Sequence, residues 1–383
     1  MSKSTGLAGI VLGVILLAGV ASAGGYRVTA GSGDDEVPVV VVWGTPHEMG
    51  RAFGELMRDE IQAFVPQALA GFQQSEPEQY NDAELDAAWE AIAPHTHARI
   101  EEEWRGLAEG SGVDFETIRR IHMIPVVSPY ACSGAALWGS ATRDDALFQF
   151  RNLDYTMHAG LQDYPAVVIY LPDEGHAHVN VTFAGVTGVN TGMNAQGIAL
   201  TEMGDSPPHE YPYDLDGAHF TFLFRDLLYD AGDLDEALEL FQNAQHIKRY
   251  HYIIGDGKTQ RGVKIRAHAP DLEIWTDNDP EDSAAPNVVE DVVYHCEGRD
   301  PIGFAHIQRY HGRYDADAVI QLSKSVGIPG GNLLNAVYDA TNLDLWVAYA
   351  HGMESAYRRP YVHIPMQEHL DPGIIPEGAT VVD

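Results

Sequence analysis

The chain has 383 residues, of which 45% are hydrophobic, so it can bury a large core. Its formal net charge is −33, from 56 acidic and 23 basic residues, and the acidic residues are dispersed along the chain. Because such a surface repels phosphate backbones and anionic lipid headgroups, neither nucleic acid nor a membrane surface is expected as a partner.

The first residues, MSKSTGLAGIVLGVILLAGVASAG, have the pattern of a secretory signal peptide. Lys3 gives a basic start, an apolar run follows, and Ala21-Ser22-Ala23 fits the small-x-small cleavage rule. The alternative is an uncleaved membrane anchor, but the apolar run of about 14 residues is shorter than the roughly 20 that a span needs. We therefore expect residues 1–23 to be removed and the mature protein to be secreted or periplasmic.

Residues 24–131 are predicted to form a helical N-terminal segment after one buried strand, Val37 to Trp43. Thr45 precedes a proline that suits the first turn of a helix. Asn81 and Asp114 are suited to cap further helices.

From residue 132 onwards the sequence is rich in short β-type segments. Strands are predicted at residues 133–138, 146–151, 166–171, 179–183, 186–190, 198–203, 251–255, 262–268, 292–295, 333–339 and 343–350. Helices are predicted at residues 220–229, 234–244 and 316–325. This order indicates an α+β fold with two packed sheets and helices outside them.

Residues 132–155 read CSGAALWGSATRDDALFQFRNLDY and are the most informative segment. Two strands joined by a turn would bring Cys132, Arg151 and Asp154 close together. A thiol, a cation and a carboxylate on one sheet edge are the components of a nucleophilic site. A second interpretation is a Cys132–Cys296 disulfide in a non-enzymatic binding protein, because exported proteins form such bridges.

The same segment resembles the nucleophile region of the penicillin acyltransferase-like (isopenicillin-N acyltransferase) family. These proteins are self-cleaving cysteine members of the N-terminal nucleophile (Ntn) hydrolases, and bile-salt hydrolases are more distant relatives. The resemblance is fair at GTPHEMGRAFGELMRDEI and at GVNTGMNAQGIALTEM, and weak between Leu215 and Glu290. It implies a four-layer αββα sandwich.

The resemblance also implies that the chain cuts itself between Ala131 and Cys132. The products would be a small chain of residues 24–131 and a catalytic large chain of residues 132–383, associated as a heterodimer. The freed α-amine of Cys132, with a reference pKa of about 7.7–8.0, would then act as the base for its own thiol. Pro125 to Ala131 is predicted to be an extended approach to the cut.

By the same resemblance, Asp154 orients and tunes the α-amine of Cys132, and Arg151 stabilises the thiolate by its charge. The alternative is a salt bridge that joins two strands. Nearby aromatic residues are predicted either to line an apolar acyl pocket or to pack in the core: Trp138, Phe148 and Tyr155.

Candidate donors for an oxyanion lie in two segments. Asn190 and Asn194 lie in GVNTGMNAQG and carry amide groups, and Asn194 matches an asparagine of the family's turn. Gly204 stands where the bile-salt relatives have a functional asparagine. His295, in VVYHCEGRD, is the candidate replacement for a second family asparagine.

The chain contains 18 histidines, and two H-x-H pairs occur, His95 with His97 and His176 with His178. No HExxH or CxxC spacing accompanies them, so we expect no metal. No GxGxxG, Walker or GxSxG sequence is present either, and no cofactor is expected.

The sequence therefore predicts an exported Ntn cysteine amidohydrolase or acyltransferase. Cys132 would attack the carbonyl of a small-molecule N-acyl substrate, form an acyl-thioester and so cleave a linear amide bond. Hydrolysis is favoured because acyl-CoA donors are scarce outside the cell. An esterase on the same fold, similar to phospholipase B-like enzymes, uses the same chemistry and stays open as an alternative.

Overall fold

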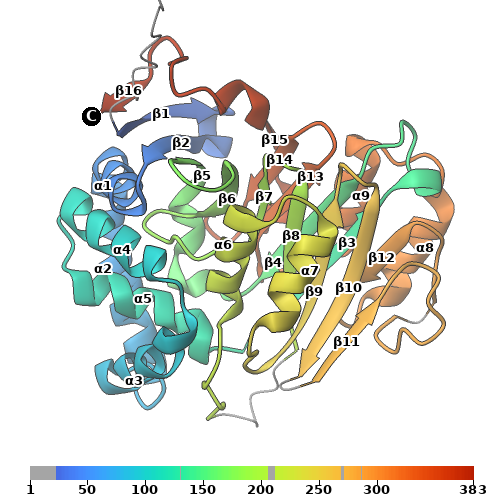
Figure 1. Ribbon diagram of the computed structural model, residues 1–383, viewed down its shortest axis with the longest axis horizontal. Helices are drawn as coiled ribbons and strands as arrows, with labels where there is room; N and C mark the ends of the chain where they lie inside the picture. The colour runs from blue at the N-terminus through green and yellow to red at the C-terminus, as the bar shows by residue number, and fades with distance from the viewer. Residues whose placement is uncertain (1–22, 130, 206–211, 269–270, 286) are drawn as a thin grey trace, which may run out of the picture.

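The computed structural model describes residues 23–129, 131–205, 212–268, 271–285 and 287–383. Residues 1–22, and with them nearly all of the predicted signal peptide, lie outside this part of the chain. Two β-sheets pack against each other, mainly through the contacts of β3 (Ala131–Leu137) and β4 (Phe148–Asp154) with β8 (Ile198–Gly204), and helices cover their outer faces (Figure 1). Within the described ranges, no helix combines the length and apolarity that a bilayer crossing needs.

Sheet A has ten strands among the residues described. In spatial order they are β11 (Asp271–Trp275), β10 (Arg261–His268), β9 (Arg249–Asp256), β8, β7 (Thr191–Asn194), β6 (His178–Phe183), β5 (Pro165–Pro172), β2 (Val37–Gly44), β1 (Gly24–Ala30) and β16 (Thr380–Val382). Neighbouring strands are antiparallel, except that β2 runs parallel to β5. Because β1 and β2 lie between β5 and β16, the predicted small chain supplies two interior strands of this sheet.

Sheet B is antiparallel, with six strands in the described part of the chain. In spatial order they are β12 (Val292–His295), β3, β4, β13 (Asn332–Asp339), β14 (Asp344–Tyr349) and β15 (Val362–Pro365). In the β3–β4 hairpin, Ala131 lies opposite Asp154 and Cys132 lies opposite Leu153. The hairpin therefore brings the first residues of β3 to the last residues of β4.

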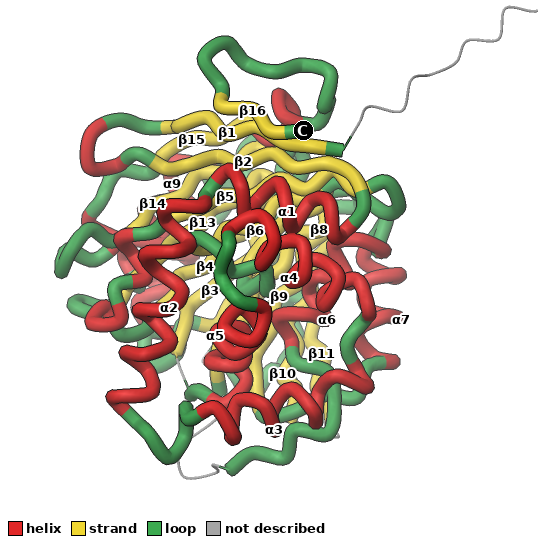
Figure 2. Tube along the Cα trace, turned by 90° about the vertical axis from the view of Figure 1, so that its left-hand side faces the viewer, coloured by secondary structure: helices red, strands yellow, loops and turns green. Residues whose placement is uncertain are grey.

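The helices form three groups. Those that precede the hairpin are α1 (Pro46–Leu56), α2 (Arg58–Ser75), α3 (Asp82–Ile92), α4 (Ala98–Ser111) and α5 (Phe115–Val127), and they lie together on one side of the molecule (Figure 2). The helices on the outer face of sheet A are α6 (Phe220–Asp230) and α7 (Leu234–Asn243), and those on the outer face of sheet B are α8 (Asp300–Tyr310) and α9 (Ala316–Ser325). The result is a four-layer αββα sandwich, as the sequence predicted.

Helix α1 shows how the sequence sets these elements. The Thr45 hydroxyl accepts the Glu48 backbone N–H, and the Glu48 carboxylate accepts the Thr45 N–H, which makes a capping box. The same helix crosses α4 at very close range, because glycines face each other at the contact. A Cβ on Gly106 would overlap the backbone carbonyl of His47.

The end of α5 corrects one prediction. Pro125 to Val127 belong to the last turn of this helix, so extended backbone begins only at Ser128. Residue 130 of the predicted approach lies outside the described residues. Proline in a last turn removes a single helical hydrogen bond. The buried Lys248 ammonium also donates to the carbonyls of Pro125, Val126 and Ser128, which stabilises the helix end.

Candidate active site

Cys132 lies at the start of β3 with its side chain fully buried. Alternation along the hairpin directs Cys132, Arg151 and Leu153 to the face of sheet B that packs on sheet A. The Cys132 sulfur accepts a hydrogen bond from Arg151 Nη2 at 3.2 Å. The structure thus brings together the thiol and the cation that the sequence predicted as partners.

Opposing influences act on the Cys132 thiol. Burial raises its pKa well above the usual range, while the charge of Arg151 and the backbone N–H of Asp154 lower it. Arg151 is also fully buried, and its Nη2 donates to a Glu202 carboxylate oxygen at 3.2 Å. These surroundings favour the protonated thiol, which needs a base before it can attack a carbonyl.

Asp154 is directed to the other face of sheet B. Its carboxylate accepts hydrogen bonds from Arg299 at 2.9 Å and from Asn332 at 3.0 Å. Burial raises the pKa of Asp154 to about 6, although Arg299 and Asn332 lower it. Asp154 lies opposite Ala131 in the sheet, beside the predicted cut, and its role as partner of the α-amine stays a prediction.

The sequence reasoning missed the residue that contacts the backbone nitrogen of Cys132. This N–H donates to Glu297 Oε2 at 3.3 Å. Burial raises the pKa of Glu297 to about 7. Glu297 and Arg299 follow β12, which pairs with β3, so strand pairing over a long sequence separation places them here. The charged run EGRD after a buried strand was the available signal.

Two predicted oxyanion donors make contacts within the protein. Both amide hydrogens of Asn194 are used by the carbonyls of Leu228 and Ala231, while its oxygen accepts the N–H groups of Gln196 and Ile198. Asn194 therefore fastens the β7–β8 turn to the end of α6. A buried side chain with all of these bonds made has no donor left for a substrate.

His295 is the other predicted donor, and its role stays a prediction. It lies opposite Gly134, and its ring packs on His251 with a centroid distance of 4.0 Å. Its Nδ1 donates to the Ala284 carbonyl at 3.3 Å and is 3.7 Å from Asp300. These contacts hold the ring between the sheets, two strand positions along from the level of Cys132.

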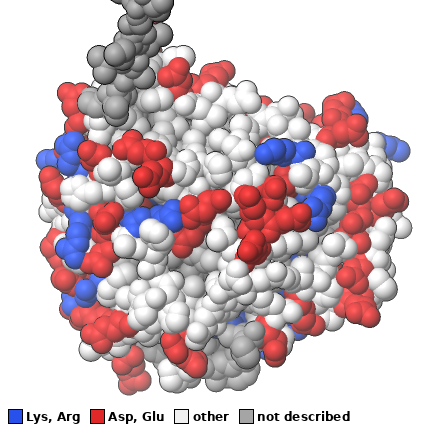
Figure 3. Space-filling view, viewed as in Figure 1, with Lys and Arg blue, Asp and Glu red and all other residues white. Residues whose placement is uncertain are grey.

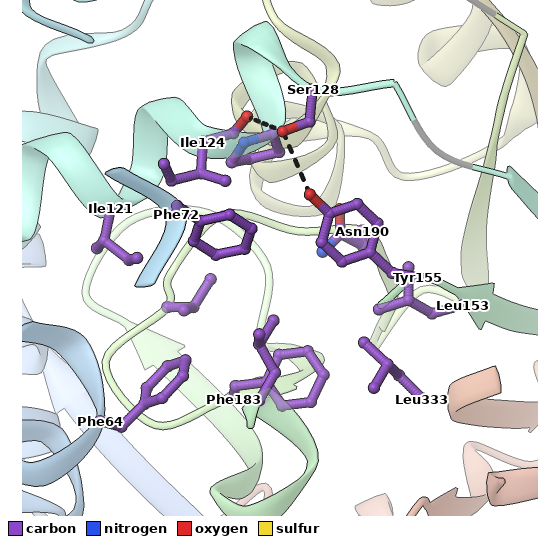
Figure 4. Close-up of a pocket in the computed structure, with 13 residues that line it drawn as sticks. Phe64, Phe72, Ile121, Ile124, Ser128, Leu153, Tyr155, Phe183, Asn190 and Leu333 are labelled. Carbon is purple, nitrogen blue, oxygen red and sulfur yellow. Dashed lines mark hydrogen bonds between the residues drawn. The ribbon is translucent and has the colours of Figure 1, made fainter. Parts of the chain in front are cut away.

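An apolar pocket lies directly beside the site. Leu153, which faces Cys132 across the hairpin, forms part of its wall together with Leu333 of β13. Phe72 and Phe183 contribute aromatic faces, and the hydroxyls of Tyr155 and Ser128 approach each other at one side (Figure 4). Asn190 supplies an amide group to this otherwise apolar lining.

Of the three aromatic residues predicted to line a pocket, only Tyr155 does so. Trp138 packs against Gly262 of β10. Phe148 lies in the core beneath α8 and α9, because alternation along β4 turns it to the outer face of sheet B.

The disulfide alternative is contradicted. Cys132 and Cys296 are both free and buried. Cys132 belongs to the core between the sheets, whereas Cys296 belongs to the core between sheet B and its covering helices. Opposite faces of one sheet keep the two sulfurs apart.

At the second histidine pair, His176 and His178, the contacts are those of core packing. His178 is buried and stacks on Tyr170 with a centroid distance of 5.1 Å, while its Nδ1 contacts the His176 carbonyl. Among the residues described, no group of three or more His, Cys, Asp or Glu side chains is arranged to hold a metal ion.

The fold and the site define a class of protein: an αββα sandwich with a buried cysteine at the start of a central strand. The family model for acyl-coenzyme A:6-aminopenicillanic acid acyl-transferase matches residues 141–282, a segment that contains Arg151 and Asp154. This match confirms the resemblance to penicillin acyltransferase-like Ntn hydrolases, and it supports an enzyme of the acyltransferase and hydrolase kind.

Two relatives from Dictyostelium discoideum match most of the chain. Protein dcd1A is 25% identical over 364 residues, covering 84% of this chain and 80% of the relative. Protein dcd1B is 24% identical over 360 residues, covering 86% and 71%.

Solved structures show more distant likenesses. The Caenorhabditis elegans ortholog of N-acylethanolamine-hydrolyzing acid amidase has a TM-score of 0.43 and 16% identity, covering 55% of this chain and 93% of that one. A mutant of conjugated bile acid hydrolase from Clostridium perfringens has a TM-score of 0.44 and 13% identity, covering 66% and 96%. Penicillin V acylase from Agrobacterium tumefaciens has a TM-score of 0.43 and 12% identity, covering 63% and 89%.

Proposed function

We propose that this protein is an exported cysteine hydrolase that cuts itself before Cys132 and then cleaves the amide bond of small N-acyl substrates. One observation carries the proposal. The buried sulfur of Cys132 accepts a hydrogen bond from the Arg151 cation at 3.2 Å, beside a pocket whose apolar wall includes the residue opposite Cys132. A nucleophile, a charge that stabilises its anion and a space for an acyl group are thereby adjacent.

The proposed reaction uses Cys132 twice. After the cut, its α-amine takes the proton of its own thiol, and the sulfur attacks the substrate carbonyl. The C–N bond breaks, the amine product leaves with that proton, and the acyl group stays on sulfur as a thioester. Water then adds its hydroxyl to the carbonyl carbon, and its proton returns to sulfur. Arg151 stabilises the thiolate, whose formation burial opposes.

The lining of the pocket supports an apolar acyl group as the part that enters it. Phenylalanine, leucine and isoleucine side chains supply most of the surface, which favours hydrocarbon over charged groups. Asn190 offers the pocket a hydrogen-bonding group for a polar atom of the substrate.

Replacing the nucleophile is the direct test. Cys132→Ala should leave one uncut chain without activity, whereas Cys296→Ala, the matched loss of the other buried thiol, should be cut and active. Denaturing electrophoresis with N-terminal sequencing measures the cut, and turnover is followed on paired amides and esters with the same acyl group. A wild-type chain that stays uncut, or activity in Cys132→Ala, would contradict the proposal. Turnover of the esters alone would identify the protein as an esterase instead.

A further inference from the structure

The nitrogen of the bond to be cut has a carboxylate beside it. In the uncut chain the Cys132 N–H donates to Glu297 Oε2 at 3.3 Å. Glu297 lies in the linker between β12 and α8, and no other carboxylate is hydrogen-bonded to this nitrogen among the contacts of the described residues. Asp154, the nearest predicted candidate, has its two oxygens on Arg299 and Asn332.

The linker is fixed on both sides of Glu297. Before it, β12 pairs with β3, which places His295 opposite Gly134. After it, Arg299 donates to the Val326 carbonyl at 2.6 Å and to the Ser133 hydroxyl at 2.7 Å. The pairing of β12 with β3 and the hydrogen bonds of Arg299 thus fix the position of the Glu297 carboxylate at the Cys132 nitrogen.

Self-cleavage needs a proton at this nitrogen. When the sulfur attacks the Ala131 carbonyl, the amide nitrogen can leave only if it is protonated as the C–N bond breaks. The guanidinium of Arg151 lies at the sulfur and does not release protons at ordinary pH. Glu297 is the group at the nitrogen that can both take and give a proton.

We propose that Glu297 is the proton relay of self-cleavage, a role that rests on the proposed function above. The Glu297 carboxylate takes the proton of the Cys132 thiol, directly or through a water molecule, as the S–C bond to Ala131 forms. It then gives this proton to the Cys132 nitrogen as the C–N bond breaks. Water hydrolyses the resulting thioester, with its hydroxyl on carbon and its proton on sulfur. Afterwards the carboxylate lies beside the new α-amine and positions it.

The surroundings of Glu297 set the pH at which the relay operates. Burial and the charges of Asp154 and Asp205 favour its protonated form, while Arg299 and the Cys132 N–H favour the carboxylate. Together these influences raise the pKa of Glu297 to about 7. Because the relay starts from the carboxylate, the rate of self-cleavage should rise with pH up to about 7 and then level off.

Self-cleavage of newly made chains tests this role. Wild type, Glu297→Gln, Glu297→Asp and a control, Glu290→Gln at an exposed glutamate, are made by cell-free translation, and uncut chain is followed on denaturing gels from pH 5 to 9. We expect Glu297→Gln to cut at least about 100-fold more slowly at pH 8 and to lose the levelling near pH 7. Glu297→Asp should restore part of the rate and the levelling, and Glu290→Gln should match wild type.

The outcomes separate the two proposals. A wild-type chain that never cuts would contradict the proposed function, whereas a Glu297→Gln chain that cuts at the wild-type rate with the same pH profile would overturn only the relay. Thermal unfolding of each variant in a Cys132→Ala background shows whether the fold is kept. Should Glu297→Gln fail to fold, Glu297→Asp decides: slower cutting that levels off at a shifted pH supports the relay, and the wild-type rate with the wild-type pH profile overturns it.

Discussion

Arg151 is a fully buried cation that contacts both the Cys132 sulfur and the Glu202 carboxylate. Its Nη2 donates to the Cys132 sulfur and to Glu202, both at 3.2 Å. The Nε donates to the Glu202 carbonyl, also at 3.2 Å, which fixes the plane of the guanidinium. The planar, forked donor set of arginine is needed to reach all of these acceptors, and lysine cannot reproduce it.

Arg151→Lys should therefore raise the pKa of the Cys132 thiol and lower turnover by about 10- to 100-fold. The charge is kept, but a single ammonium loses the geometry that places it on the sulfur. The pH dependence of Cys132 alkylation by iodoacetamide measures the pKa, in a Cys296→Ala background so that only one thiol reacts. Arg313→Lys, at an exposed arginine, is the control. An unchanged alkylation profile in Arg151→Lys would show that Arg151 serves packing rather than the thiol.

The part of the candidate site that lies within one hairpin was predictable from the sequence. Cys132 and Arg151 belong to one hairpin, whose strand signals and turn were visible in the sequence, and the structure places their side chains in contact. Glu297 contacts Cys132 across 165 positions of sequence, and a single sequence does not show which strands pair. The structural contacts of Asn194 were not foreseen, because an asparagine that closes a turn and one that binds an oxyanion look the same in sequence.

At the scale of elements, the crossing of α1 and α4 depends on glycine. Gly50 and Gly54 of α1 face Gly106 and Gly110 of α4, and a Cβ at any of the four would meet backbone atoms of the facing helix. By contrast, a Cβ on Gly71, in the exposed face of α2, would meet no other atom within 4 Å. These positions provide a matched pair of substitutions.

Gly106→Ala should lower the free energy of unfolding by about 2–3 kcal/mol, because the helices must separate to admit a methyl group. Gly71→Ala should raise it by about 0.5–1 kcal/mol, because alanine is the better helix former and nothing opposes it. Urea unfolding in a Cys132→Ala background, where the chain stays whole, measures both. Equal effects of the two substitutions would show that a methyl group fits between α1 and α4 after all.

Strong local patterns predicted elements well, and weak ones did not. The helix at residues 316–325 and the strand at 292–295 occur with the predicted bounds, since the helix has apolar residues at helical spacing and the strand is a short apolar run. The strand predicted at 186–190 is absent; these residues connect a turn at Gly185 to β7, which begins at Thr191. Strands β1, β11, β15 and β16 and helix α8 were missed, as most of them are short or lie at an edge where few apolar residues are needed.

For the molecule as a whole, the acidic charge is a property of the surface. Asp and Glu side chains are spread over the visible face, with fewer Lys and Arg side chains among them (Figure 3). That anionic polymers are not partners stays a prediction from this charge. The apolar pocket near Cys132 is therefore the better indication of what the protein binds.

The two products of the proposed cut should remain associated. Strand β2 pairs with β5 and β1 pairs with β16, so residues 24–131 form part of the interior of sheet A. Separating the chains would expose both strand edges and the core under α1 to water. We expect one peak in native size-exclusion chromatography that contains both fragments, and separation only in denaturant. Release of the smaller fragment without denaturant would contradict this arrangement.

Strands β12 and β13 pair with the β3–β4 hairpin although they follow it by more than 130 residues of sequence. This pairing determines when self-cleavage can occur. Under the proposed chemistry, Glu297 and Arg299 must be in place before the bond at Cys132 can break, and Asn332 holds the neighbouring carboxylate. A ribosome would thus have to finish nearly the whole polypeptide before scission became possible. Stalled or truncated translation products would stay uncut and inactive. A cut chain would therefore be one whose synthesis and folding had both been completed.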